Sequence, residues 1–152
     1  MRVFFMDHLI KEIYDLIGGD FVLVGSRSMI HHGIDIKSRK REVDIIVIDE
    51  VVFNLLKSLG EYEINENGER TPFREKKRMF ITMPNREFID VYLDTDYPNH
   101  ITKTINDQEI KIRSKDSYLN HYKNILENYD FDKYDYHGQF KEKILKYINL
   151  LS

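Results

Sequence analysis

The chain has 152 residues, of which 41% are hydrophobic and 32% are charged, and its formal net charge is −3. This size and composition predict one soluble domain, residues 1–152, with a single hydrophobic core, and the small net charge excludes a global attraction to nucleic acid. The chain contains no cysteine and no apolar run near the roughly 20 residues that span a bilayer. Its first residues have too short an apolar stretch before Asp7 for us to expect a secretory signal. We therefore expect a cytoplasmic protein without disulfides, thiolate metal sites or membrane association.

The first third of the chain has the periodicity of alternating helices and strands. Helices are expected at 7–17, 26–32 and 50–59, and strands at 20–24 and 43–48. Gly18-Gly19 ends the first helix, and Ser26 is expected to cap the second. The strand at 43–48 is almost wholly apolar after Asp44, which is typical of a central strand in a sheet.

The remainder predicts further strands followed by two helices. The expected elements are an edge strand at 61–65, a hairpin of 78–83 and 86–94, a short strand at 110–113, and helices that contain Tyr118–Leu126 and Phe140–Leu151. Pro84-Asn85 forms the turn of the hairpin. The order of elements predicts an α+β (α/β-like) fold, with a mixed sheet at 20–113, helices on one side, and a C-terminal helical pair at 114–151.

Gly25-Ser26 lies at the junction of a predicted strand and a short helix. The glycine allows a sharp turn and the close approach of a ligand. The serine opens a helix, whose free N–H groups and dipole favour a phosphate. Because many such junctions are purely structural, this motif gains meaning only from the acidic residues that follow it.

Three acidic residues lie in the predicted strands. Glu42 and Asp44 are two residues apart, so their side chains point to the same side of the strand. Two adjacent like charges are costly unless a cation neutralises them, and Mg²⁺ is held by one or two carboxylates plus substrate phosphates. Alternatively, both acids are simply exposed where the strand begins. Asp90 lies among apolar neighbours in mid-strand, where an acid either faces solvent with Tyr92 or binds a partner.

Two clusters of basic residues accompany these acids. The members are Lys37, Arg39, Lys40 and Arg41 in the first cluster and Arg70, Arg74, Lys76, Lys77 and Arg78 in the second. Such runs are usually solvated loops. The first cluster directly precedes the paired acids, so Arg41 is also a candidate for local attraction of phosphate.

The order Val24-Gly25-Ser26, a short helix, Glu42-Val43-Asp44 and then Asp90 resembles the nucleotidyltransferase superfamily of the polymerase-beta type. It is similar in particular to the small abortive-infection and toxin nucleotidyltransferases. In that superfamily a hydrophobic-Gly-[Gly/Ser] motif precedes an acid-hydrophobic-acid motif, and a third acid follows on a later strand. The resemblance spans roughly residues 20–125, and it implies that Lys123 contacts phosphate.

The resemblance also implies an activity. The protein would transfer a nucleoside monophosphate from an NTP, such as ATP, to a hydroxyl of RNA, protein or a small molecule. Glu42, Asp44 and Asp90 would be the catalytic and metal-binding residues, with two Mg²⁺ ions, or Mn²⁺ in their place. Gly25, Ser26, Arg41 and Lys123 would bind the nucleotide phosphates, and toxin relatives imply a cognate regulatory partner protein.

The sequence departs from the family pattern in ways that leave an alternative open. Glu42 stands where aspartate is usual, and a register that begins at Asp44 would place Ile46 at the second acidic position. In that case the chain would be a catalytically inactive module that binds nucleotide or a partner protein. A metal-dependent nuclease is a weaker alternative, because Asp90-Val91-Tyr92 lacks the lysine of the acid-x-Lys motif.

Overall fold

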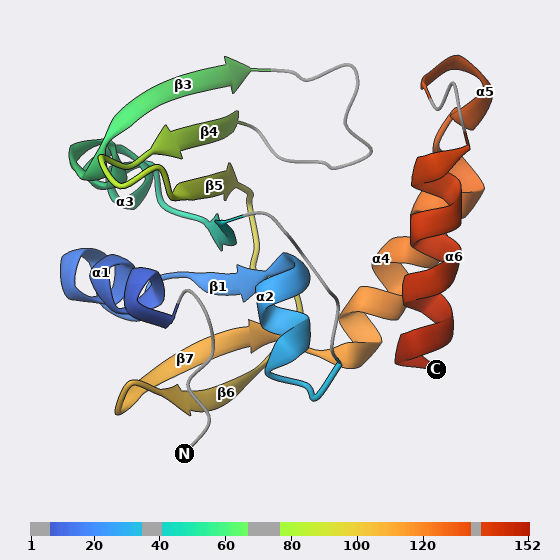
Figure 1. Cartoon of the computed structure of the whole chain (residues 1–152), viewed down its shortest axis with the longest axis horizontal. Coiled ribbons are helices and arrows are strands. Elements are labelled where there is room, and N and C mark those ends of the chain that lie inside the picture. Colours follow the sequence, from blue (N-terminus) through green and yellow to red (C-terminus); the bar gives the residue numbers. More distant parts are fainter. Residues whose placement is uncertain (1–6, 35–40, 67–76, 135–137) are drawn as a thin grey trace.

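A mixed β-sheet forms the centre of the structure, a computed structural model that describes residues 7–34, 41–66, 77–134 and 138–152. The strands are β1 (Val22–Val24), β2 (Glu42–Val47), β3 (Glu61–Glu66), β4 (Lys77–Thr82), β5 (Phe88–Leu93), β6 (His100–Ile105) and β7 (Gln108–Arg113). They form one sheet in the order β3-β4-β5-β2-β1-β7-β6 (Figure 1). The β2–β5 and β1–β7 pairs are parallel and the others antiparallel.

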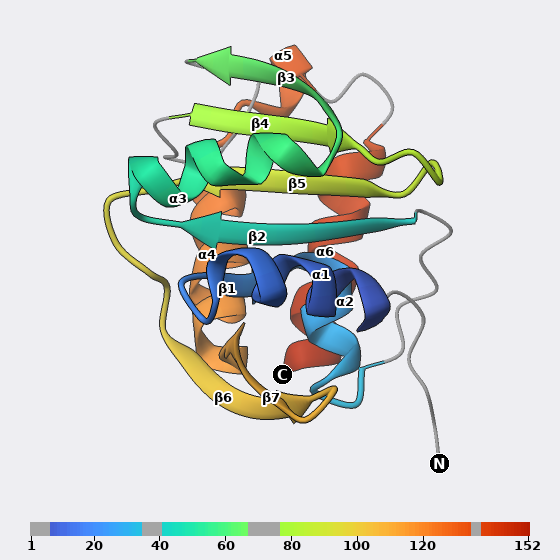
Figure 2. The same ribbon diagram turned by 90° about the vertical axis from the view of Figure 1, so that its left-hand side faces the viewer.

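Helices cover both faces of this sheet. They are α1 (Asp7–Ile17), α2 (Gly25–Ile30), α3 (Glu50–Leu55), the 3₁₀ helix η1 (Leu56–Leu59), α4 (Lys115–Asn128), α5 (Phe131–Tyr134) and α6 (Gln139–Leu151). Figure 2 shows α1 and α3 in front of the sheet and the C-terminal helices α4 and α6 behind it. The predicted α+β class, with a mixed sheet and a C-terminal helical pair, is confirmed. The expectation of helices on one side of the sheet is corrected, because α2, α4 and α6 pack together on the face opposite to α1 and α3.

The main hydrophobic core lies between the sheet and the layer that α1 and α3 form. Alternate residues of β2, Val43, Ile45 and Val47, are fully buried on this side and pack with the apolar face of α1. Burial of each such side chain contributes about 1.5–3 kcal/mol. Because successive side chains of a strand point to opposite faces of the sheet, the other residues of β2 lie on the opposite face. They are Glu42, Asp44 and Ile46.

A second core joins α2 to α4 and α6 on that opposite face. Met29 of α2 packs with Tyr118 and Tyr122 of α4 and with Tyr147 of α6. The Tyr118 hydroxyl also donates to the Gly25 carbonyl oxygen at 3.1 Å. Both tyrosines of α4 are buried in this core, and the hydrogen bond from Tyr118 fixes α4 against the start of α2.

The structure corrects three local expectations. Strand β6 was not predicted; it pairs with β7 through a turn at Asn106 and Asp107, which both have positive φ. The serine at position 26 does not cap α2, because that helix already begins at Gly25 and has no side-chain cap. The segment between the two predicted C-terminal helices, for which no element was expected, contains the short helix α5. Within the described ranges, no helix is long and apolar enough to cross a membrane.

Candidate active site

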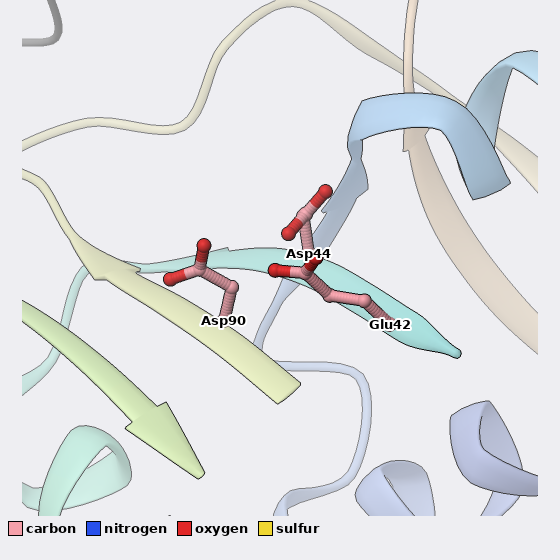
Figure 3. Close-up of side chains that lie close together, drawn as sticks. All are labelled: Glu42, Asp44 and Asp90. Atoms are coloured by element: carbon pink, nitrogen blue, oxygen red, sulfur yellow. The ribbon is translucent and has the colours of Figure 1, made fainter. Parts of the chain in front are cut away.

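Sheet register brings the three predicted acids together. Asp44 of β2 and Asp90 of β5 are direct cross-strand partners, and Glu42 lies two residues before Asp44 on the same face. One carboxylate oxygen of each residue lies within 4.8 Å of the others. Figure 3 shows the three side chains close together on one face of the sheet. We call Glu42, Asp44 and Asp90 the carboxylate triad.

Gly25 is the point at which the backbone meets this triad. Its φ is +72°, and a Cβ built on it would overlap Oδ2 of Asp44 and lie 3.0 Å from the Asp44 Cγ. The positive φ is cheap only for glycine. The strand-to-helix junction thus needs glycine for its conformation and also for the space that the Asp44 carboxylate occupies.

The electrostatic environment of Asp44 disfavours its charge. Burial raises the pKa of the Asp44 carboxyl well above its ordinary value, and the neighbouring charges of Glu42 and Asp90 raise it further. Like charges at this separation repel one another unless a proton or a cation lies between them. The triad is therefore a place where the fold gathers negative charge at an energetic cost.

Asp90 differs from the other two acids because a cation already contacts it. Arg78 of β4 donates from Nε to Asp90 Oδ1 at 2.8 Å and from Nη2 to Oδ2 at 2.5 Å, and the Tyr92 hydroxyl donates to Oδ2 at 2.9 Å. The Asp90 residue is only 1% exposed. The bidentate hydrogen bond to Asp90 raises the pKa of Arg78, so this guanidinium stays charged across the physiological pH range.

The sequence did not identify Arg78 and Tyr92 as site residues. Arg78 appeared only as part of a basic cluster, in which Lys77 also proves to be paired, at 2.5 Å, with Glu50. Burial and the neighbouring Asp90 and Asp44 raise the pKa of the Tyr92 hydroxyl, which keeps it protonated as a donor. For Tyr92 the available signal was its spacing of two from Asp90 on one strand, whereas the position of Arg78 depends on the register in which β4 pairs with β5.

The donor set of the triad fits a hard divalent cation. Carboxylate oxygens are the ligands that Mg²⁺ and Mn²⁺ take in proteins, and the three oxygens lie within coordinating reach of one another. The raised pKa of Asp44 points the same way, since a cation would relieve the repulsion that causes it.

The other predicted phosphate contacts differ in their surroundings. Ser26 is half-buried in the first turn of α2, whereas Lys123 is exposed on α4. Arg41 directly precedes β2, but its Nη2 lies 3.7 Å from Oε2 of the buried Glu87. The structure thus places Gly25 against the triad, Ser26 next to it in the chain, and Arg41 beside another acid. The rest of the first basic cluster, at 37–40, lies outside the described residues.

Comparison with known proteins identifies the fold. No profile of a known protein family matches the sequence, and no curated protein matches it either. The lincomycin-bound crystal structure of the lincosamide antibiotic adenylyltransferase LnuA covers 99% of this chain and 98% of its own, with 14% identity and a TM-score of 0.54. ANT(2″)-Ia in complex with adenylyl-2″-tobramycin covers 96% and 87%, with 11% identity and a TM-score of 0.56.

A third solved structure extends this likeness. An antigenic nucleotidyltransferase-like protein from Paracoccidioides brasiliensis covers 96% of this chain and 72% of its own, with 16% identity and a TM-score of 0.53. Each likeness spans nearly the whole chain at low identity. The chain therefore has the nucleotidyltransferase fold that its motif order predicted.

Proposed function

We propose that this protein is a metal-dependent nucleotidyltransferase that transfers a nucleoside monophosphate from an NTP to a hydroxyl group. The convergence of the carboxylate triad beside Gly25 carries this proposal. The fold supports it, because two structures of the same fold concern adenylyl transfer: LnuA is an adenylyltransferase, and ANT(2″)-Ia is bound to adenylyl-2″-tobramycin. By the same likeness we propose ATP as a donor and a small molecule as the acceptor.

Glu42 and Asp44 would hold Mg²⁺ together with the nucleotide phosphates, and Asp90 would share in a second ion. Bound there, the metal supplies charge neutralisation of the phosphates and of the triad itself. Gly25 leaves the backbone open to the phosphates at the start of α2. Ser26, Arg41 and Lys123 remain our proposed phosphate contacts, of which Ser26 is nearest to the triad in the chain.

Asp90 is proposed to orient the acceptor hydroxyl and to take its proton. In the reaction, the acceptor oxygen forms a bond to the α-phosphorus, the bond from that phosphorus to the bridging oxygen breaks, and pyrophosphate leaves. Each oxygen of an ionised carboxylate accepts more than one hydrogen bond. Asp90 can therefore keep its contacts with Arg78 and Tyr92 while it receives the hydroxyl.

A specific observation favours a second function, an inactive module that binds nucleotide without transfer. The Arg78 guanidinium already bonds both oxygens of Asp90, so it supplies one positive charge where a second metal ion would otherwise lie. If Arg78 blocks that position permanently, the chain would bind nucleotide through Glu42 and Asp44 alone. Nucleotide binding without any transfer would support this alternative.

Isothermal titration calorimetry with ATP tests the proposal. The wild type should bind ATP in 5 mM MgCl₂ and lose at least about tenfold in affinity in EDTA, because the metal links triad and phosphates. Asp44→Asn should lose affinity in Mg²⁺ to a similar extent. Glu127→Gln, an exposed acid on α4, is the matched control and should bind as the wild type does. Binding that neither EDTA nor Asp44→Asn changes would contradict the proposal.

A further inference from the structure

The carboxylate of Asp90 is almost fully occupied as a hydrogen-bond acceptor. Its Oδ2 accepts from the Arg78 Nη2 and from the Tyr92 hydroxyl, and its Oδ1 accepts from the Arg78 Nε. The two oxygens of an ionised carboxylate offer about four acceptor positions. The described residues therefore take three of these positions, which leaves one, on Oδ1.

In the proposed reaction Asp90 has two tasks, because it shares in a second ion and also receives the acceptor hydroxyl. Each task needs a position on the carboxylate, and a single position is open while Arg78 keeps both of its hydrogen bonds. One of the present donors must therefore leave when the ion binds. That donor is Arg78 rather than Tyr92, because the guanidinium repels a cation and the hydroxyl is neutral.

The charge balance of the triad leads to the same conclusion. Together with Arg78, the three ionised carboxylates carry a net charge of −2, which one divalent cation neutralises. The buried Arg27 of α2 also interacts with Asp44, but the charge of Asp7 acts on the same guanidinium and offsets it. A second divalent ion therefore needs more negative charge nearby, and the phosphates of an NTP supply it.

Arg78 is also the partner that has room to move. Its side chain is 34% exposed, whereas that of Asp90 is 2% exposed, so the guanidinium reaches solvent and the carboxylate does not. The guanidinium carbon lies 5.2 Å from the centre of the Tyr92 ring, a contact that attracts a cation independently of Asp90. After release from Asp90, Arg78 is thus hydrated and still beside an aromatic partner.

We propose that Arg78 is a positioning residue that fixes the order in which the two ions bind. In the protein without nucleotide, Arg78 holds Asp90, and one ion binds at Glu42 and Asp44. When an NTP is bound, its phosphates offset the charge of a second ion, and Arg78 then yields Asp90 to that ion. The inference rests on the proposed function, since it concerns the metal ions of that reaction. It differs from the inactive alternative, in which Arg78 never leaves Asp90.

Electron paramagnetic resonance of free Mn²⁺ counts the bound ions in the full-length protein. Without nucleotide we expect one Mn²⁺ per wild-type chain, and with one equivalent of α,β-methylene ATP, which is not cleaved at the α-phosphate, we expect two. Asp90→Asn should bind one ion with the analogue, which identifies the second ion as that of Asp90. Two ions of equal affinity in the wild type without nucleotide would overturn the inference, and so would a single ion under both conditions.

Arg78→Met should admit the second ion without nucleotide, because it removes the competing charge and opens both oxygens of Asp90. We expect its affinity for that ion to be at least about tenfold higher than that of the wild type. Arg78→Lys keeps the charge but loses the paired hydrogen bonds, so its affinity should lie between the two. Lys77→Met is the matched control, because it removes the same charge from the adjacent position of β4, where Lys77 pairs with Glu50. It should bind one ion, as the wild type does.

Thermal unfolding separates this role from a purely structural one. In EDTA, Arg78→Met should unfold at a lower temperature than the wild type, because the buried Asp90 loses its cationic partner. Mn²⁺ should restore much of this loss and should raise the Tm of the variant more than that of the wild type. Equal stabilisation of both proteins by Mn²⁺ would show that Arg78 does not compete with the ion. The wild-type and Asp90→Asn counts test the inference even if Arg78→Met does not fold.

Calorimetry of MgATP on the same samples distinguishes this inference from the proposed function. If the wild type binds Mn²⁺ and MgATP but Arg78→Met gains no ion, the positioning role of Arg78 is wrong while the nucleotide site stands. If the wild type binds neither, the proposed function fails and this inference fails with it.

Discussion

Two acidic regions lie close together in this fold and are treated in opposite ways. Glu87, just before β5, is buried, and its carboxylate accepts hydrogen bonds from His8 Nε2 at 2.7 and 2.8 Å and from the Asn85 side chain, with Arg41 3.7 Å away. The carboxylate triad instead places three acids within 4.8 Å of one another. Glu87 is thus surrounded by hydrogen-bond donors, whereas each acid of the triad lies next to other acids.

The pKa directions express this difference. Burial by itself raises the pKa of Glu87, but hydrogen bonds from His8 and Asn85 and the charge of Arg41 bring it below its ordinary value. For Asp44, burial and the charges of Glu42 and Asp90 act together and raise the pKa. A buried acid with its donors in place is a structural element. One that faces other acids indicates a site built for a ligand that the chain itself does not supply.

The largest expected effect comes from removing the central charge of the triad. Asp44→Asn should lower the rate of nucleotidyl transfer at least about a hundredfold, equivalent to about 3 kcal/mol of transition-state stabilisation, because the metal loses a ligand. Radiolabelled ATP with the natural acceptor, or hydrolysis of ATP in its absence, provides the measurement. Glu127→Gln should retain full activity. If Asp44→Asn also retains full activity, the triad does not differ in function from an ordinary acidic surface.

Loss of charge at Glu87 should affect stability and spare function. Glu87→Gln leaves the donors of His8 and Asn85 with a weaker acceptor in a buried position, so we expect the free energy of unfolding to fall by about 2 kcal/mol. Urea unfolding followed by circular dichroism measures this change, and the exposed Glu12→Gln on α1 is the control. Affinity for MgATP in the folded variant should equal that of the wild type; a loss of that affinity would assign Glu87 to the site.

Substitution of Gly25 should damage stability and site together. Gly25→Ala forces an L-residue into the left-handed region, at a cost of about 1–2 kcal/mol, and its Cβ displaces the Asp44 carboxylate. We expect lower thermal stability and weaker MgATP binding. Gly33→Ala is the matched control, because Gly33 also has a positive φ, of 80°, but open space around its Cβ position. It should show the stability loss alone. If both variants bind MgATP equally well, contact between Gly25 and Asp44 has no role in the site.

The smallest effect concerns pH, and its sign should be opposite for the two regions. Because the folded-state pKa of Asp44 is raised above its usual 3.8, its contribution should make stability fall as pH rises from about 4 toward that higher pKa. The lowered pKa of Glu87 adds stability above its usual 4.5, which is lost as pH falls through the folded value. Without metal, Asp44→Asn should therefore raise the free energy of unfolding near neutral pH, because the uncharged amide no longer repels Glu42 and Asp90.

Urea unfolding at several pH values between 3 and 8 compares these two contributions in EDTA. The Asp44→Asn substitution should flatten the decline toward neutral pH, and Glu87→Gln should flatten the fall at acid pH. Profiles that change in the same direction in both variants would show that the two acids are not in opposite environments. Addition of Mg²⁺ should stabilise the wild type most, since it neutralises the triad.

The sequence predicted the triad because its evidence is local. Spacing of two on a strand was sufficient to place Glu42 and Asp44 on one face, and the apolar alternation around Asp90 gave the phase of β5. Long apolar faces likewise located α1 and α4 correctly. Contacts that depend on a partner distant in the chain were not accessible in this way. Strand β6 was missed although the Asn106-Asp107 turn, whose residues have positive φ, was a usable signal.

Most of the contacts that the sequence did not predict join residues on different strands. Arg78 reaches Asp90 only because β4 and β5 pair in one particular register. Glu87 lies in the polar stretch Asn85-Arg86-Glu87, and its partner His8 is 79 residues away. Nothing in the local pattern distinguishes such an acid from a solvent-exposed one. The close approach of Gly25 to Asp44 depends in the same way on the pairing of β1 with β2.

Direct measurement of metal binding tests the central claim most sharply. Electron paramagnetic resonance of free Mn²⁺, titrated into protein without nucleotide, counts bound ions through the loss of the free-ion signal. We expect the wild type and Glu87→Gln to bind Mn²⁺ with equal affinity and Asp44→Asn to bind it at least about tenfold more weakly, because the triad supplies the ligands. If the wild type binds no Mn²⁺, or Asp44→Asn binds it as well as the wild type does, the carboxylate triad is not a metal site.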